Sequence, residues 1–370
     1  MRKLIFLIAV LAFAVPVFAQ DATSEPTEEA TMAASEPWTC PEGFEGQTLS
    51  VYNWSTYVAD DTISNFEAAC GVTVVYDVYG GNEELISRLS GGNPGYDVAV
   101  PTDHAVADMI ARGMVQPIDL ANIPNFANVS EDLKDPAYDP GNVYSVPYQW
   151  GTIGVGYNTE KITEPITSWD QVFSYDGPVA WLDDPRAMMG VALQILGYDA
   201  NSADPAQITE ARDFLINNGG NVVSIAADDG QAQLERGDVD IAIEYMGDIF
   251  QLVASCECET FAFSLPEEGS NLWVDNLVIL ADAPNKPLAE AFIDYILDPQ
   301  VGADISNYTA YASPNQAAID MGLIDPEYLD SPIIYPPEEQ RANLFTILPL
   351  PDAQQLYNDA WDEIKISLGQ

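Results

Sequence analysis

Acidic and aromatic side chains stand together after several segments that have the composition of buried strands. These groups occupy 53–57, 101–104, 183–184, 244–248 and 273–275. A buried ammonium group loses several kcal/mol of hydration unless carboxylates and hydrogen bonds replace the water. An aromatic face adds about 0.5–2 kcal/mol by cation–π contact. Acids interleaved with tryptophan and tyrosine therefore favour a pocket for an organic cation.

The same residues also have a purely structural interpretation. An acid after a strand often caps the helix that follows, and a tryptophan or tyrosine more often packs in a core than against a ligand. The chain has 58 Asp and Glu residues against 12 Lys and Arg, so acids fall near aromatics by chance in many places. The residue types alone suggest a cation pocket and leave the structural interpretation open.

The formal net charge of −46 excludes several classes of function. Proteins that bind nucleic acid or an anionic membrane surface need clustered basic residues. Because His104 is the single histidine, a zinc site with several histidines is impossible and a Ser-His-Asp triad would have to use that residue. We find no nucleophile motif, and the glycines at 151–156 are not followed by a helical pattern. We therefore expect no metal, no cofactor and no catalysis.

Strand-like and helix-like segments alternate along the chain, and this order determines where the side chains meet. The β-rich runs are 48–52, 72–78, 96–100, 178–182 and 239–245. The runs with helical spacing are 60–69, 83–89, 105–112, 186–196, 205–217 and 288–297. The alternation predicts an α/β fold with a largely parallel sheet, arranged as two lobes that extended segments join. Ligands of such sheets bind beyond the carboxyl ends of the strands, where the acids and aromatics stand.

The beginning of the chain has the pattern of an export signal. Arg2 and Lys3 precede an apolar run, 4–19, that ends in a small-residue cleavage pattern and is too short to span a bilayer. We predict a signal peptide at 1–19 and a disordered linker at 20–39, which is rich in Ser, Thr, Glu, Pro and Ala. The protein is then exported to a periplasm or the extracellular space. The sequence leaves open whether the signal is cleaved or is retained as an anchor that tethers the protein to the cell surface.

Four cysteines follow the signal, and export permits disulfides. Cys40 precedes the first strand and Cys70 ends the first helix, so we expect a bridge between them. Cys256 and Cys258 are two residues apart, where a bridge would close a very small ring. The state of this second pair stays open.

Four motifs, in this order, resemble the polyamine (spermidine/putrescine) solute-binding proteins of ABC importers: VYNWSTYV at 51–58, YDVAVP at 96–101, VPYQWG at 146–151 and YPP at 335–337. RANLFT at 341–346 and AW at 360–361 resemble the putrescine-binding branch in particular. The similarity covers about residues 46–370. It implies a periplasmic-binding-protein fold of type II, the two-lobed Venus-flytrap form with two crossover hinge segments. It also implies that the protein presents its ligand to a membrane permease.

The resemblance further implies which residues bind the ligand. They are, in chain order, Trp54, Ser55, Tyr57, Thr102, His104, Asp184, Tyr245, Asp248, Trp273, Asp275 and Tyr311. Asp275 matches the main amine-binding acid of the family, and Asp248 matches an acid of the putrescine branch. His104 stands where the spermidine-binding branch has a tyrosine. We expect it to be a neutral wall residue when ligand is bound, with an affinity that falls below about pH 6.

Two positions depart from the family. Thr56 and Ala187 stand where the family has acids, so the site for the second amine has lost carboxylates. Glu244, Asp228 and Asp229 are candidates to replace them. The length and charge of the ligand are therefore open.

The sequence thus predicts an exported, monomeric solute-binding protein for putrescine or spermidine. Lobe 1 comprises 40–150 and 274–319, and lobe 2 comprises 151–273 and 320–370. One alternative is the same fold binding another organic cation or an amino-acid derivative. Another is an extracellular enzyme that uses Asp183 and Asp184 as acid and base. A third is an acidic surface protein adapted to salt.

Overall fold

The computed structural model describes residues 37–227, 229–256, 260–350 and 352–370. The predicted signal peptide and residues 20–36 of the predicted linker lie outside these ranges. Within them, none of the helices combines the length and the apolar composition that a membrane crossing needs.

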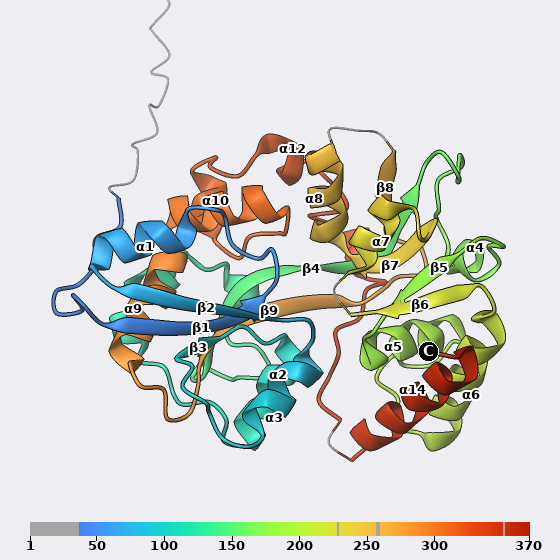
Figure 1. Cartoon of the computed structure of the whole chain (residues 1–370), viewed down its shortest axis with the longest axis horizontal. Coiled ribbons are helices and arrows are strands. Elements are labelled where there is room, and N and C mark those ends of the chain that lie inside the picture. Colours follow the sequence, from blue (N-terminus) through green and yellow to red (C-terminus); the bar gives the residue numbers. More distant parts are fainter. Residues whose placement is uncertain (1–36, 228, 257–259, 351) are drawn as a thin grey trace, which may run out of the picture. The chain divides into compact units, whose positions relative to one another are not determined.

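A mixed sheet forms the framework of the protein (Figure 1). Its strands, in spatial order, are β2 (Thr73–Tyr79), β1 (Thr48–Trp54), β3 (Val98–Ala99), β9 (Leu272–Ile279), β4 (Ser145–Asn158), β7 (Ile241–Tyr245), β5 (Val179–Leu182) and β6 (Val222–Ala226), with β8 (Phe261–Ser264) pairing to β4. The pairs β1–β2, β1–β3, β5–β6 and β5–β7 are parallel. The alternation of strands and helices predicted parallel pairing of this kind, although β6 was not among the predicted strands.

The pairing of β4 with β9 is antiparallel and was not predicted. These two strands lie side by side through the middle of the sheet, with the β1 and β5 groups on either side (Figure 1). β4 carries the chain from one group to the other and β9 carries it back, so the two strands must run in opposite directions. The sheet is therefore less purely parallel than the sequence suggested.

Helices follow most strands, and the apolar spacing predicted some of them. They are α1 (Thr62–Cys70), α2 (Asn82–Leu89), α3 (Asp103–Ala111), α4 (Trp169–Phe173), α5 (Pro185–Ile195), α6 (Pro205–Asn218), α7 (Gly230–Arg236), α8 (Met246–Cys256), α9 (Lys286–Ile296), α10 (Pro299–Thr309), α11 (Gln316–Asp320), α12 (Pro326–Leu329), α13 (Glu338–Arg341) and α14 (Gln354–Leu368). Short 3₁₀ turns lie at Leu120–Asn122, Pro124–Asn128 and Glu131–Leu133. α1 ends because Gly71 adopts a left-handed conformation, with φ of 66°, that closes the last turn.

The N-terminal end of the described chain is fastened to α1 and α9. Cys40 forms the predicted disulfide with Cys70. Trp38 donates a hydrogen bond from its indole to Asp294, 2.8 Å away, and its ring packs on Phe66. Cys256 is disulfide-bonded as well. The sequence left open whether Cys258 bonds to it, and Cys258 lies outside the described residues.

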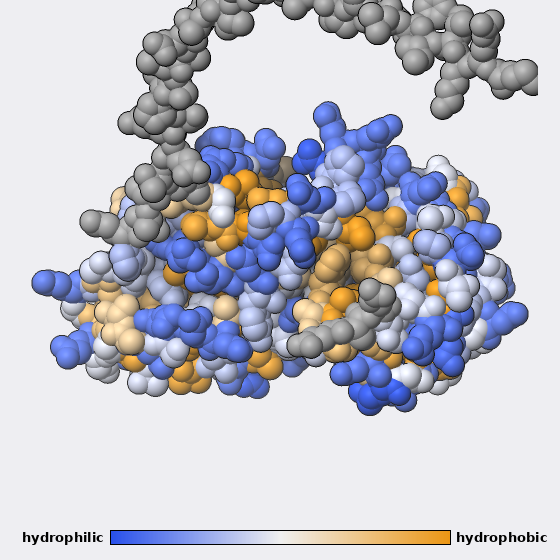
Figure 2. All heavy atoms as spheres, turned by 90° about the horizontal axis from the view of Figure 1, so that it is seen from above, coloured by the Kyte–Doolittle hydropathy of each residue, from blue (hydrophilic) through white to orange (hydrophobic). Residues whose placement is uncertain are grey.

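The surface carries much of the acidity. Hydrophilic side chains are spread over the face seen in Figure 2, with apolar side chains between them. The core of the sheet contrasts with this surface, because β4, β5, β7 and β9 bury almost every residue. Among the described residues, few acids are buried, and Glu244, Asp248 and Asp275 are among these.

Candidate functional site

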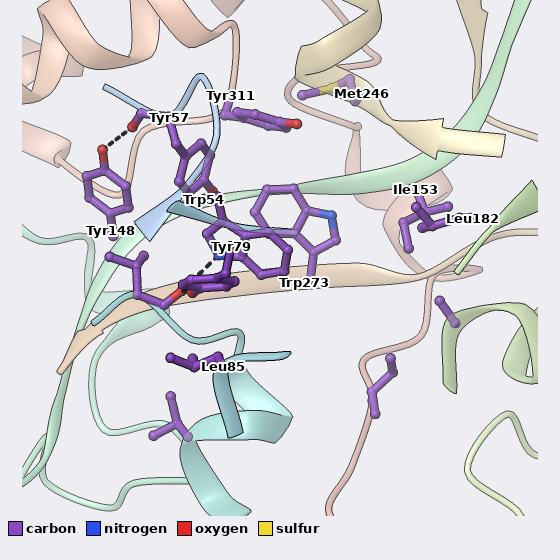
Figure 3. Packing of buried hydrophobic residues seen from close by; sticks show 14 of the residues in the cluster. Trp54, Tyr57, Tyr79, Leu85, Tyr148, Ile153, Leu182, Met246, Trp273 and Tyr311 are labelled. Carbon is purple, nitrogen blue, oxygen red and sulfur yellow. Dashed lines mark hydrogen bonds between the residues drawn. The ribbon is translucent and has the colours of Figure 1, made fainter. Parts of the chain in front are cut away.

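A pocket with about 310 Å³ of empty space lies where the ends of several elements meet. Its lining residues are Trp54, Ser55, Tyr57, Thr102, Tyr245, Asp248, Trp273, Asp275 and Tyr311. All nine are among the ligand-binding residues that the resemblance implied. Figure 3 shows four of the aromatic side chains gathered at this point.

The elements explain why these side chains converge. Trp54 is the last residue of β1, Tyr245 is the last residue of β7, and Asp248 lies in the first turn of α8. Trp273 and Asp275 are two positions apart on β9, so strand alternation points both to the same face. β9 therefore supplies an aromatic ring and a carboxylate that face in the same direction.

Asp275 is the most constrained acid of the pocket. Its side chain is buried, with 4% exposure, and its Oδ2 accepts a hydrogen bond from the Tyr57 hydroxyl at 2.7 Å. Its Oδ1 is buried and has no hydrogen-bond partner. Burial raises the pKa of Asp275 to about 7, although the Tyr57 hydrogen bond and the nearby Thr102 side chain act in the opposite direction. A buried acceptor without a partner is unfavourable, so this oxygen is suited to receive a donor from a ligand.

Asp248 is the second acid. Its Oδ2 accepts from the Tyr311 hydroxyl at 2.8 Å, and its Oδ1 is 3.4 Å from the Thr56 hydroxyl. Burial raises the pKa of Asp248 to about 6, against the effect of these two hydrogen bonds. Thr56 adopts a φ of 47°, a left-handed conformation that is unfavourable for a β-branched residue. The position that has lost the family's acid thus supports Asp248 through a hydroxyl.

The aromatic rings of the pocket form a continuous series of edge-to-face contacts. Ring centroids are 6.1 Å apart for Trp54 and Tyr245, and 5.8 Å apart for Tyr245 and Trp273. They are 5.2 Å apart for Trp273 and Tyr311, and 5.3 Å apart for Tyr311 and Tyr57. The Trp273 indole nitrogen is buried without a partner. Such rings can offer both π-faces and methylene-packing surface to an organic cation.

Asp184 and His104 do not line this pocket. Asp184 is the N-cap of α5, and its Oδ1 accepts from the backbone N–H groups of Arg186 and Ala187 at 3.0 and 2.9 Å. His104 lies in the first turn of α3 and lines a neighbouring hollow between α2, α3 and α14. Contact of either residue with a ligand stays a prediction.

Two of the three proposed replacement acids also lie elsewhere. Glu244 is fully buried, and its Oε1 accepts from the backbone N–H of Tyr245. Asp229 accepts from the side chain of Gln233, and Asp228 lies outside the described residues. Neither Glu244 nor Asp229 lines the pocket.

Sequence reasoning missed the tyrosines that hold the pocket wall. Tyr148 donates a hydrogen bond to the carbonyl oxygen of Tyr57 (Figure 3). Tyr79 and the Trp54 indole both donate to the carbonyl oxygen of Val100. Tyr148 lies in the motif VPYQWG, which carried part of the resemblance, but nothing local in that motif indicates where its hydroxyl points. Among the described residues, no group of acids, cysteines and histidine has the arrangement of a metal site.

Comparisons with known proteins find similar sequences over most of the chain. The family described as bacterial extracellular solute-binding protein matches residues 61–335. The putrescine-binding periplasmic protein SpuD of Pseudomonas aeruginosa is 34% identical over 341 residues, which are 87% of this chain and 92% of the relative. The putrescine-binding periplasmic protein PotF of Escherichia coli is 34% identical over 344 residues, with the same coverage.

Solved structures match over a similar length. A putative spermidine/putrescine ABC transporter protein from Listeria monocytogenes is 31% identical, with a TM-score of 0.81 over 86% of this chain and 99% of that one. The substrate-binding protein PotD from Streptococcus pneumoniae has a TM-score of 0.74 at 29% identity, over 87% of this chain and 100% of that one. The predicted two-lobed periplasmic-binding-protein fold is thereby confirmed. The chain belongs to the family of bacterial extracellular solute-binding proteins.

Proposed function

We propose that the protein captures a polyamine and delivers it to an ABC permease, with putrescine and spermidine as the first candidates for the ligand. The polyamine would lie in the pocket between Trp54, Tyr57, Tyr245 and Trp273. The observation that carries this proposal is the unpaired Oδ1 of Asp275 in an aromatic pocket. An ammonium group there would supply the missing donor and the missing positive charge together. Similar proteins carry the names putrescine-binding and spermidine/putrescine-binding periplasmic protein, and these names support the same ligand class.

The two pocket acids define how one amine would be held. Asp275 and Asp248 come from different elements, β9 and α8, and each is held by a tyrosine hydroxyl. A ligand that contacts both carboxylates stabilises the conformation in which β9 and α8 lie close together. It drives closure only through this difference in affinity between conformations. The permease would then recognise the closed form.

The enzyme alternative has little structural support. Asp183 accepts from the Trp361 indole at 2.7 Å and from the Lys365 ammonium at 2.6 Å. Asp184 is engaged as a helix cap. Both members of the suggested acid–base pair therefore have structural partners, and neither lines the pocket.

Ligand screening of the purified protein, freed of co-purifying ligand, tests the proposal. Putrescine or spermidine at micromolar concentration should raise the melting temperature, and calorimetry should give one site per chain. Lysine, arginine, choline and glycine betaine are the comparison ligands, since they represent the alternative of another organic cation or an amino-acid derivative. A response to one of these solutes and to no polyamine would refute the ligand assignment.

A further inference from the structure

His104 lies beside the pocket in a strongly acidic environment. Its side chain is 15% exposed, and its Nδ1 is 3.5 Å from Oδ1 of Asp103, which is an ion-pair distance. The hollow that it lines is also lined by Glu83 from α2 and by Arg186 from α5. The ring is thus enclosed between elements that supply charged groups from several sides.

The groups that face His104 are mostly carboxylates. Asp103 lies on its own helix, Glu83 belongs to α2, and Asp184 caps α5. Burial lowers the pKa of His104, but the nearby Asp103 carboxylate, with the charges of Asp184 and Glu83, outweighs it and raises the pKa above its usual value. The Nδ1 atom is buried without a hydrogen-bond partner. The pKa of Glu83 is also raised, by burial and by Asp184, and His104 opposes this change.

The cations near His104 have other partners. The Arg186 guanidinium donates to Gln354, Asn201 and the carbonyl oxygen of Leu348. Farther along α3, Arg112 and Asp108 form an ion pair with each other at 2.8 Å. Arg186 also acts electrostatically on Asp184, whereas among the described residues no Lys or Arg forms an ion pair with Glu83 or Asp103. A proton on His104 is the counter-charge available to these two carboxylates.

The acidic environment of His104 is continuous with the pocket. Thr102, two residues earlier, lines the pocket and forms a backbone bridge with Asp275 on β9. Asn82, the neighbour of Glu83, donates to the Thr102 hydroxyl at 2.9 Å. His104 acts electrostatically on Asp275, and its charge lowers the pKa of that acid. A ligand ammonium and a protonated His104 would therefore compete for the same carboxylates.

We propose that His104 carries a proton in the ligand-free protein and releases it to solvent when a polyamine binds. This inference rests on the proposed function. The imidazolium loses its N–H proton to the buffer and becomes neutral, and the ligand's positive charge takes its place among Glu83, Asp103, Asp184 and Asp275. The affinity then falls as the pH drops below the pKa of His104 in the free protein, by up to about tenfold per pH unit for one proton.

Nuclear magnetic resonance of the full chain without a histidine tag tests the proton directly. The sequence has one histidine, so selective ¹³C labelling of histidine gives the ring signals of His104 alone. Titration between pH 5 and pH 9 should show that saturating putrescine lowers the pKa of the ring by at least one unit. An unchanged pKa, or a ring that stays protonated in the complex at pH 7, would overturn the inference.

Calorimetry provides a second readout. Putrescine is titrated at pH 6.5 in buffers that differ in ionisation enthalpy, which gives the number of protons released per ligand. Asp275 and Asp248 also release protons when an ammonium binds, so the comparison is with His104→Gln and His104→Tyr, which keep both acids. Both variants should release fewer protons than the parent protein and should bind more tightly at pH 6. Equal proton release in all three would overturn the inference, whereas a parent protein that binds no polyamine would refute the proposed function.

Discussion

The hydroxyl of Tyr57 lies 2.7 Å from Oδ2 of Asp275, and the other oxygen of the same carboxylate is buried without a partner. One residue follows β1 and the other lies on β9, at a sequence separation of 218. The hydrogen bond orients the carboxylate so that its unpaired oxygen is available to a ligand. The first two predictions concern this carboxylate, which has one paired and one unpaired oxygen.

Replacing Asp275 by Asn should abolish most of the affinity for putrescine. The amide keeps the shape but removes the charge, and loss of one partner from a buried charged pair costs about 2–5 kcal/mol. We expect an affinity lower by about 100-fold or more at pH 8, measured by calorimetry. Asp330→Asn removes an exposed acid that does not line the pocket and is the control. A loss of less than threefold in Asp275→Asn would contradict the role of this carboxylate.

The stability of the ligand-free protein should depend on pH through Asp275. Its pKa is about 7 in the folded protein and about 3.9 in an unfolded chain, so the folded state binds the extra proton between these values. The free energy of unfolding that this acid contributes is therefore fully present below about pH 4 and is lost as the pH rises through about 7. Asp275→Asn lacks this dependence. Between pH 4.5 and pH 8, the melting temperature of the parent protein should fall relative to that of Asp275→Asn. A constant difference between the two would show that Asp275 has an ordinary pKa.

Replacing Tyr311 by Phe should weaken binding in a pH-dependent way. The Tyr311 hydroxyl stabilises the charged form of Asp248, so its removal raises the pKa of Asp248 above about 6. We expect an affinity loss of about tenfold that is larger at pH 6.5 than at pH 8.5, since fewer Asp248 side chains are ionised at the lower pH. Tyr308→Phe removes an exposed hydroxyl that donates to Asp60 and should have no effect. Equal losses for Tyr311→Phe at both pH values would argue against this mechanism.

Replacing Gly151 by Ala should disturb two rings of the pocket. A Cβ at this position would lie 2.8 Å from Cζ2 of Trp273 and 3.2 Å from Cδ1 of Tyr311, so both rings must move. We expect a tenfold or greater loss of affinity and a lower melting temperature, because overpacking costs about 1–3 kcal/mol. Gly220→Ala is the matched control, since no heavy atom lies within 4 Å of its added Cβ. Unchanged affinity in Gly151→Ala would mean that the ring positions are not critical.

Removing the disulfide should affect stability and leave binding unchanged. Cys40 and Cys70 are separated by 30 positions, and cross-linking a loop of this length stabilises by about 3–4 kcal/mol in the chain-entropy model. The double variant Cys40→Ala with Cys70→Ala should unfold at a lower denaturant concentration. Its putrescine affinity at 25 °C should match that of the parent protein, because neither cysteine lines the pocket. A large loss of affinity would place the N-terminal end of the folded region in the binding mechanism.

Local signals in the sequence were sufficient for α1, α2, α3, α5, α6 and α9 and for the parallel arrangement of β1, β2 and β3 and of β5 and β7. They did not predict β6 or later helices such as α8, α10 and α14. The apolar spacing before Gly71 predicted α1, and the Cys40–Cys70 bridge followed from the predicted positions of its cysteines. The antiparallel pairing of β4 with β9 was not predictable in the same way. Its partners, such as Gln149 and Asp275, are far apart in sequence, and no local pattern specifies such a pairing.

The candidate site shows the same limit. Trp54 lies at the end of β1, where aromatics and acids were expected, whereas Asp275 lies within β9 and was selected through the family resemblance. Ligand binding by either residue stays a prediction. The support from Tyr148 was not found, because a hydroxyl that reaches a distant backbone carbonyl leaves no periodic signal. Glu83 was missed for another reason. An acid in the first turn of a helix is so common that its position beside His104 gave no reason to select it.

Thr102 caps α3 through its backbone, bridges to Asp275, receives a hydrogen bond from Asn82 and lines the pocket. One residue thus joins the scaffold to the pocket wall, so substitutions there that reshape the pocket should also weaken the scaffold. Glu83 lies on α2 and His104 lies on α3. The described contacts give neither residue a comparable structural role. We therefore expect changes of ligand specificity among related proteins to begin at residues beside the pocket, such as Glu83 and His104. Thr102 should change less, because both the fold and the pocket wall depend on it.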